Sequence, residues 1–247
     1  MEVHTHAHSE RKKWTHYLWE FLMLFLAVFC GFLAENQREH MVENKREKEY
    51  MQSLTEDLST DTANLDRAME FGQVIRTRLE NLISLLNNES SRDSVAQLYK
   101  LDRQSGRVVN IDFEDRTSSQ LKNAGNMRLI RNRSVADSTR SYWSHIKTAE
   151  TISARLEELR LKAGDISAQI FHNKYIKLSD PHHPIGSVIS ILPDAKLISD
   201  DPKLLALYSN RRQVTLTVLN NYINEMVDAK TAATNLIALI KKEYHLK

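Results

Sequence analysis

The stretch MQSLTEDLSTDTANLDRAMEFGQVIRTRLENLISLL, residues 51–86, decides the fold. Its apolar residues recur at alternating steps of three and four, and only Asp61 and Gly72 interrupt the series. The series occupies positions 51, 54, 58, 61, 65, 68, 72, 75, 79, 82 and 86. Such a step places one side of an α-helix against neighbouring helices. Residues 51–86 therefore predict a long helix that packs along its whole length.

Two later stretches repeat this step, residues 135–170 and residues 205–240. Each of the three stretches corresponds to about 54 Å of helix. Equal lengths favour three long helices packed side by side at shallow angles. Asp201 suits the cap of the third helix, and Pro202 suits its first turn. The 247 residues include only 6 glycines and 4 prolines, which also favours long helices over turns.

Short elements are expected between the long helices. Residues 94–103 predict a short helix, and residues 117–125 predict another that ends at Gly125. RVVNIDF, residues 107–113, has the β-branched composition of an extended piece. VISIL, residues 188–192, predicts a short strand that can pair with the extended piece at the far end of the bundle.

Three polar residues fall on the apolar seams of the long helices: Asp61, His145 and Arg212. Polar groups in a seam cost stability unless they are partnered, and they can fix the register of the helices. If the first and third helices run parallel, Asp61 and Arg212 reach nearly the same layer. We therefore predict an Asp61–Arg212 pair. The alternative is that each side chain reaches solvent at the edge of its seam.

A membrane span is predicted over residues 14–35. Glu20 is the only polar residue between Leu18 and Ala34. Counted from Trp14, the helix is about 31 Å long, close to the hydrocarbon thickness of a bilayer. Bulky phenylalanines precede the small residues that a signal peptidase requires, so we expect an uncleaved anchor.

Several residues of this span are candidate membrane-interface or oligomer contacts. The aromatic residues Trp14, Tyr17 and Trp19 cluster at one end, as interfacial aromatics do. Glu20 beside them is either a boundary residue at the headgroups or a group that faces a partner helix and forms a ring in an oligomer. The small residues at the other end, spaced by four and three, allow close helix approach: Ala27, Gly31 and Ala34.

The flanks of the span set the expected location. A polar tail, residues 1–13, ends in a compact basic run, whereas the stalk, residues 36–50, is charged on all faces. A compact basic flank favours a cytoplasmic N-terminus. We therefore expect a bacterial inner-membrane protein whose helical domain, residues 51–247, lies in the periplasm.

The histidine clusters have two interpretations. His4, His6 and His8 alternate, so they can share a metal ion if the chain is extended, or they can belong to a polar tail. His182 and His183 are adjacent and point apart in an extended chain, which favours a loop role. We predict no metal site and no cofactor.

A basic run follows the short helix at residues 117–125. Arg128, Arg131 and Arg133 can bind an anionic ligand or a lipid phosphate. The alternative is a solvated helix face.

The composition excludes several classes of function. Charged residues make up 27% of the chain and nearly balance at a net charge of +2, so nucleic-acid binding is not expected. Cys30 is the single cysteine, which rules out a disulfide within the chain and a cysteine zinc site. The motifs GxGxxG, HExxH and GxSxG and the Walker lysine motif are absent. We predict that the protein is not an enzyme.

Two blocks carry a resemblance to a known family. WEFLMLFLAVFCGFLAENQREHMVENKREKEYMQSLTEDLSTDT, residues 19–62, resembles the N-terminal signature of a family of Bacteroidota single-pass membrane proteins with a domain of unknown function. SSQLKNAGNMRLIRN, residues 118–132, resembles a second block of that family. The resemblance implies a small membrane-anchored helical protein. It implies no reaction and no catalytic residue.

These observations predict an all-α chain in which an N-terminal transmembrane helix continues through a charged stalk into an extended antiparallel bundle of three long helices plus short elements. We expect an interaction or scaffold protein that acts through homo-oligomerisation or as a subunit of an envelope complex. Its partners would be membrane lipid and either copies of itself or other membrane proteins. The alternatives are a ligand-sensing bundle that signals through a partner and an accessory subunit of a channel or transporter.

Overall fold

The computed structural model describes residues 14–88, 94–107, 109–123, 125–178 and 189–246. The chain is all-α, as predicted. The helices are α1 (Trp14–Asn87), α2 (Val95–Ser105), α3 (Arg116–Asn123), α4 (Arg133–Ile170) and α5 (Pro202–Tyr244). Two 3-10 turns, η2 (Asn126–Leu129) and η3 (Asn173–Tyr175), and two strands, β1 (Ile176–Leu178) and β2 (Ile189–Ile191), complete the list.

The chain divides into two compact units between Tyr50 and Met51. In the first unit, the apolar residues of α1 that follow Trp14 are exposed. An 18-residue window of this helix has a mean hydropathy of 2.0, and none of it is buried. By length and composition this is one candidate membrane span, a property that a signal sequence shares.

Local side-chain pairs accompany this part of α1. His16 Nε2 lies 3.1 Å from a carboxylate oxygen of Glu20, one turn further along the helix. In the predicted stalk, Lys45 Nζ lies 3.9 Å from the carboxylate of Glu49, also one turn away. Pairs at this spacing support an exposed helix by a few tenths of a kcal/mol each, about 0.2–0.5 kcal/mol.

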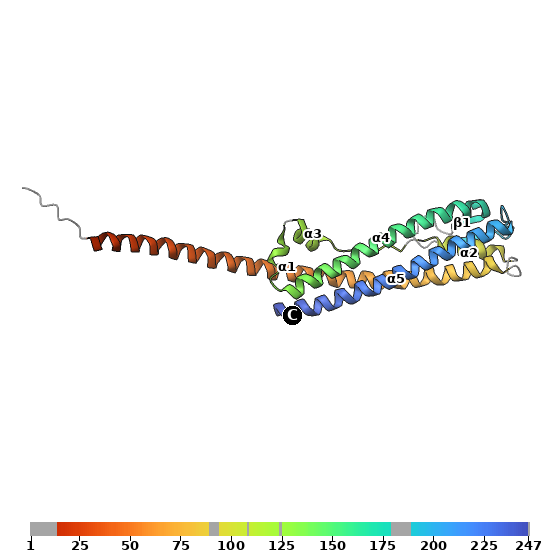
Figure 1. Cartoon of the computed structure of the whole chain (residues 1–247). Helices are drawn as coiled ribbons and strands as arrows, with labels where there is room; N and C mark the ends of the chain where they lie inside the picture. The colour runs from red at the N-terminus through yellow and green to blue at the C-terminus, as the bar shows by residue number, and fades with distance from the viewer. Residues whose placement is uncertain (1–13, 89–93, 108, 124, 179–188, 247) are drawn as a thin grey trace, which may run out of the picture. The chain divides into compact units, whose positions relative to one another are not determined.

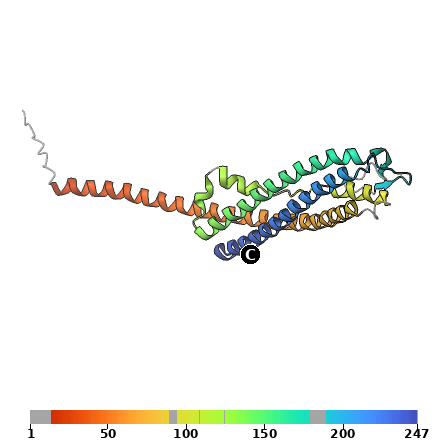
Figure 2. The ribbon, with the colours of Figure 1, turned by 45° about the vertical axis from the view of Figure 1, so that its right-hand side comes forward.

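The second unit is a bundle of three long helices, formed by residues 51–87 of α1 together with α4 and α5 (Figures 1 and 2). The directions follow from contacts between helices. Ser209 donates a hydrogen bond to Asn87 at one end, and Lys230 lies 2.6 Å from Asp66 further along, so α5 runs antiparallel to α1. Figure 1 shows α4 running in the same direction as α1.

The predicted seams are the buried faces of these helices. Every seam position of α1 from 51 to 86 and of α5 from 205 to 240 is buried, and every seam position of α4 is buried or half-buried. Asp201 accepts a hydrogen bond from the Lys203 N–H and caps α5 as predicted, with Pro202 in the first turn. Asn132 caps α4 by accepting a hydrogen bond from the Val135 N–H.

Gly72 interrupts the apolar series because α5 approaches α1 closely at this level. A Cβ atom at residue 72 would lie 3.2 Å from Cγ1 of Ile223 and 3.8 Å from Cε of Met226. Contacts at the shorter distance force the neighbouring side chain to move. The absence of a side chain therefore lets Ile223 pack against the α1 backbone.

The short strands pair differently from the prediction. β2 does form within the predicted VISIL segment, but it pairs with β1 in antiparallel register, with Ile176 opposite Ile191. The residues that follow α2 run back along the bundle without strand pairing and place Val109 in the core. We call residues 109–115 the crossover segment. Because α4 runs parallel to α1, the chain must return along the bundle before α4 begins, and the crossover segment makes this return (Figure 1).

Candidate functional site

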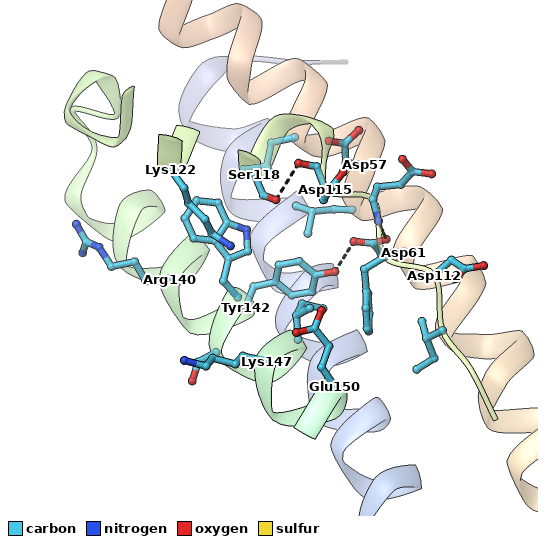
Figure 3. Close-up of a pocket in the computed structure, with 18 residues that line it drawn as sticks. Asp57, Asp61, Asp112, Asp115, Ser118, Lys122, Arg140, Tyr142, Lys147 and Glu150 are labelled. Carbon is cyan, nitrogen blue, oxygen red and sulfur yellow. Dashed lines mark hydrogen bonds between the residues drawn. The ribbon is translucent and has the colours of Figure 1, made fainter. Parts of the chain in front are cut away.

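An open groove of about 780 Å³ lies between α1, the crossover segment, α3 and α4. We call it the acidic groove, because its lining includes six carboxylates and three cationic side chains. Figure 3 shows Asp61 of α1 facing Tyr142 of α4, with Asp57, Asp112 and Asp115 on the same side of the groove as Asp61. The acidic members are Asp57, Asp61, Asp112, Glu114, Asp115 and Glu150, and the cationic members are Lys122, Arg140 and Lys147.

Asp61 joins three elements at the base of the groove. Its side chain is 2% exposed. One carboxylate oxygen accepts the hydroxyl of Tyr142 on α4 at 2.5 Å, and the other accepts the Glu114 N–H of the crossover segment at 2.8 Å. Figure 3 shows the Tyr142 hydroxyl pointing at this carboxylate. Asp61 therefore fastens both α4 and the crossover segment to α1.

Burial is the largest influence on the pKa of both partners in this pair. Loss of water raises the pKa of Asp61, and the bonds from Tyr142 and the Glu114 N–H lower it by a smaller amount. Burial and then the charge of Asp61 raise the pKa of Tyr142, so its hydroxyl keeps its proton at neutral pH. Tyr142 therefore acts as a hydrogen-bond donor to Asp61 rather than as a base.

Asp57, one turn earlier on α1, fastens the start of α3. Its buried carboxylate accepts the Thr117 N–H at 3.0 Å and the Arg116 guanidinium at 2.8 Å. A carboxylate at a helix N-terminus satisfies an unpaired backbone donor and interacts favourably with the helix dipole. The four-residue spacing of Asp57 and Asp61 puts both on one face of α1, where they hold the crossover segment and α3 as one wall of the groove.

The rest of the groove is open to solvent. The Lys122 ammonium lies 4.2 Å from the centre of the Trp143 ring, a cation–π contact between α3 and α4. Trp143 and Phe113 are half-buried, whereas Asp112 and Glu150 are exposed. The groove therefore presents apolar surface bordered by exposed carboxylates.

A second polar cluster lies toward the other end of the bundle, around Asp102 of α2. Its carboxylate accepts hydrogen bonds from the Tyr208 hydroxyl, from Ser167 at 3.0 Å and from Arg212 at 3.3 Å. Arg212 also donates from Nε to the Tyr208 oxygen at 2.8 Å. Burial and then the charge of Asp102 raise the pKa of Tyr208. The cluster ties α2 to α4 and α5.

The predicted Asp61–Arg212 pair is wrong. Asp61 binds Tyr142 and the crossover segment, whereas Arg212 binds Asp102. The reason is the direction of α5: an antiparallel helix carries Arg212 to the level of the end of α1, away from Asp61. The third polar seam residue, His145, lies 2.7 Å from Glu225 of α5.

The predicted basic run is exposed. Arg128 and Arg131 face solvent, and Arg133 lies 3.6 Å from Asp137 on the next turn of α4. An anion site on these residues stays a prediction.

The membrane-related candidates lie on the first unit. Trp14, Tyr17 and Trp19 are exposed, as are the small residues Ala27, Gly31 and Ala34. Their contacts with lipid or with other spans stay predictions.

The histidines at positions 4, 6, 8, 182 and 183 lie outside the described residues. Within the described part of the chain, no three His, Cys, Asp or Glu side chains come together as metal ligands.

Sequence reasoning missed Asp57 and Asp102. The available signal for Asp57 was its position: it lies next to the seam residue Leu58 and four residues before Asp61. Asp102 gave no comparable signal, because α2 is short and its orientation depends on packing against α4 and α5.

Comparisons of the chain with protein-family models, with curated proteins and with solved structures found no match. The resemblance to the Bacteroidota family therefore stays a prediction, and function has to be argued from the acidic groove itself.

Proposed function

We propose that the protein is a membrane-anchored, non-enzymatic interaction protein whose acidic groove binds a basic and apolar segment of another envelope protein. Residues 14–35 would hold it in the bacterial inner membrane as a single span, with residues 51–247 in the periplasm. The observation that carries the proposal is the composition of the groove: exposed carboxylates around half-buried aromatic surface, with twice as many acidic as cationic side chains.

The charge of the groove selects the chemistry of the partner. Complementary charge speeds encounter and disfavours wrong partners, whereas buried aromatic surface supplies affinity. Lysine or arginine side chains would pair with the exposed Asp112 and Glu150, and apolar side chains would cover Trp143. A cationic amphipathic segment satisfies both requirements.

The buried groups of the groove support binding rather than catalysis. Asp57 and Asp61 direct their carboxylate oxygens to donors of the protein itself. The Tyr142 hydroxyl donates a hydrogen bond to Asp61. These bonds give the groove a wall that is fixed before a partner arrives, and such preorganisation lowers the entropic cost of binding.

Site-specific photo-crosslinking in cells tests the proposal. A benzophenone amino acid replaces Lys147, an exposed residue of the groove, and in a control protein it replaces Lys203, exposed in the first turn of α5. We expect an adduct from position 147 alone, with a partner segment that contains Lys or Arg beside apolar residues. Asp112→Asn with Glu150→Gln should lower its yield about 2- to 30-fold, because each exposed ion pair is worth about 0.2–1 kcal/mol.

The other outcomes also have a definite meaning. An adduct with a second copy of the chain would assign the groove to homo-oligomerisation. Equal yields from positions 147 and 203, or an adduct that is unchanged by the two neutralising substitutions, would overturn the proposal.

A further inference from the structure

A small cavity lies inside the bundle, separate from the acidic groove. Its volume is about 30 Å³, and a site for one water molecule needs at least roughly 10–15 Å³. Its apolar walls are Ile75 and Leu79 of α1, Val109 of the crossover segment, Leu156 of α4 and Leu219 of α5. Its polar lining is Ser105, Arg107, Arg160, Arg212 and Thr215. Three arginine residues therefore line a space for one small molecule or ion.

Arg212 lines this cavity and has a donor nitrogen that forms no hydrogen bond with a described residue. The residue is 3% exposed, and its hydrogen bonds use Nε, toward Tyr208, and Nη2, toward Asp102. Among the described residues, none accepts a hydrogen bond from Nη1. A guanidinium carries five N–H donors, so Nη1 of Arg212 remains able to donate to a ligand.

Arg107 adds a charge that no carboxylate of the described chain balances. It is half-buried, and the structure gives it no ion pair. Its charge acts on a second half-buried arginine, Arg78 of α1, which also forms no ion pair with a described residue. Burial and then the charge of Arg107 lower the pKa of Arg78. Arg160 differs, because its guanidinium binds Glu157 at 2.7 and 2.6 Å.

The lining therefore has an excess of positive charge and lacks a carboxylate. Asp102 and Glu157 neutralise Arg212 and Arg160 from outside the cavity, but Arg107 and Arg78 stay uncompensated. Positive charges held together at partial burial repel one another, and a bound anion would relieve this repulsion. A water molecule could accept hydrogen bonds in the same space but would not balance the charge.

We propose that this cavity binds one small monovalent anion of the size of chloride, held by Arg107 and by the free Nη1 of Arg212. The small volume of the cavity favours a monatomic anion over phosphate, sulfate and carboxylate ligands. The anion would connect the residues after α2 with α4 and α5, and would thus act as a structural ion of the bundle. This inference does not depend on the function proposed for the acidic groove.

Thermal unfolding of the full chain in detergent tests the site. Sodium chloride is compared with sodium gluconate at constant ionic strength, because gluconate is too large for the cavity. A ligand at about 15 times its dissociation constant raises the ratio of folded to unfolded protein about 16-fold. For a domain of this size we expect Tm to rise by roughly 3–6 °C in chloride.

A matched pair of variants separates the cavity from general salt effects. Arg107→Gln removes the uncompensated charge, whereas Arg103→Gln removes an exposed charge of α2 that does not line the cavity. The chloride-specific rise in Tm and the broadening of the chloride-35 NMR line should disappear in Arg107→Gln and persist in Arg103→Gln. Equal responses in both variants, or equal Tm values in chloride and gluconate, would overturn the proposal.

Crystallography of the unmodified chain in bromide gives an answer even if Arg107→Gln fails to fold. An anomalous bromide peak between Arg107 and Arg212 would support the site. Electron density without an anomalous signal at that position, or bromide at surface sites only, would contradict it.

Discussion

Removal of the Asp61 carboxylate should destabilise the bundle, because two donors then lose their acceptor. Asp61→Ala leaves the buried Tyr142 hydroxyl and the part-buried Glu114 N–H without their bonds of 2.5 and 2.8 Å. An unsatisfied buried donor costs about 1–3 kcal/mol. The Glu114 N–H is near the surface and regains water, and the wild-type carboxylate itself suffers from burial. We therefore expect a loss of about 2–4 kcal/mol in the free energy of unfolding.

Urea unfolding of the full chain in detergent measures this loss. Trp143 lines the groove, so its fluorescence reports the region around Asp61 once Trp14→Phe and Trp19→Phe have removed the other two tryptophans. With an m value of about 2 kcal/mol per M, the midpoint should fall by about 1–2 M urea. The m value itself should not change.

A double-mutant cycle with Tyr142→Phe tests the reasoning. Tyr142→Phe alone should cost about 1–3 kcal/mol, because one oxygen of Asp61 loses its donor. The double variant should be more stable than the sum of the single losses implies, by about 1–2 kcal/mol. Additive losses would show that the two side chains are not coupled, and the account of the groove base would be refuted.

Four further predictions concern other bonds of the chain. Asp102→Asn should lower the free energy of unfolding by about 3–5 kcal/mol in urea titrations, because buried Arg212 loses its counter-charge. The stability of the wild type relative to Asp61→Asn should fall as the pH rises above about 4, because burial raises the folded-state pKa of Asp61 above its unfolded value of about 3.9. Asp201→Ala should cost about 1 kcal/mol in the same titrations through loss of the α5 cap. If the spans associate, oxidation should link two copies through Cys30 on non-reducing gels.

Each of these has a matched control or an opposing result. Asp165→Asn is the control for Asp102→Asn, and Asp200→Ala is the control for Asp201→Ala. Both controls remove an exposed carboxylate and should change the free energy of unfolding by less than about 0.5 kcal/mol. The wild type gaining stability relative to Asp61→Asn as pH rises would mean that the carboxylate is stabilised, not penalised, by its site. A monomer band after oxidation in membranes would argue against contact at Cys30.

The periodic apolar series was sufficient to place the long helices. The first series ended at position 86 and α1 ends at Asn87, whereas the series at 135–170 coincides with α4 to within two residues. This agreement has a physical reason: a continuous seam constrains every third or fourth residue of a helix, so many independent positions carry the same information. The cap at Asp201 was predicted for a similar reason, because its chemistry is local.

The partners of buried polar residues could not be predicted in the same way. Asp61 and Arg212 were correctly assigned to buried seams, yet their predicted pairing was wrong. The apolar periodicity of one helix does not determine whether the neighbouring helix runs parallel or antiparallel to it. The pairing of β1 with β2 instead of with residues 107–111 has the same origin. Both depend on how the chain returns along the bundle, and this return is made by the crossover segment, which has no regular hydrogen-bond pattern.

The fastening of the crossover segment has a mechanical consequence. Asp57 and Asp61 lie within the first three turns of the bundle part of α1, which starts at Met51. A tensile force applied between Met51 and a ligand in the acidic groove would pass through these few turns, the two carboxylates and the wall that they hold. The region around α2, β1 and β2 does not lie between these two points of force. The groove end would therefore bear the tension while the opposite end stays relaxed.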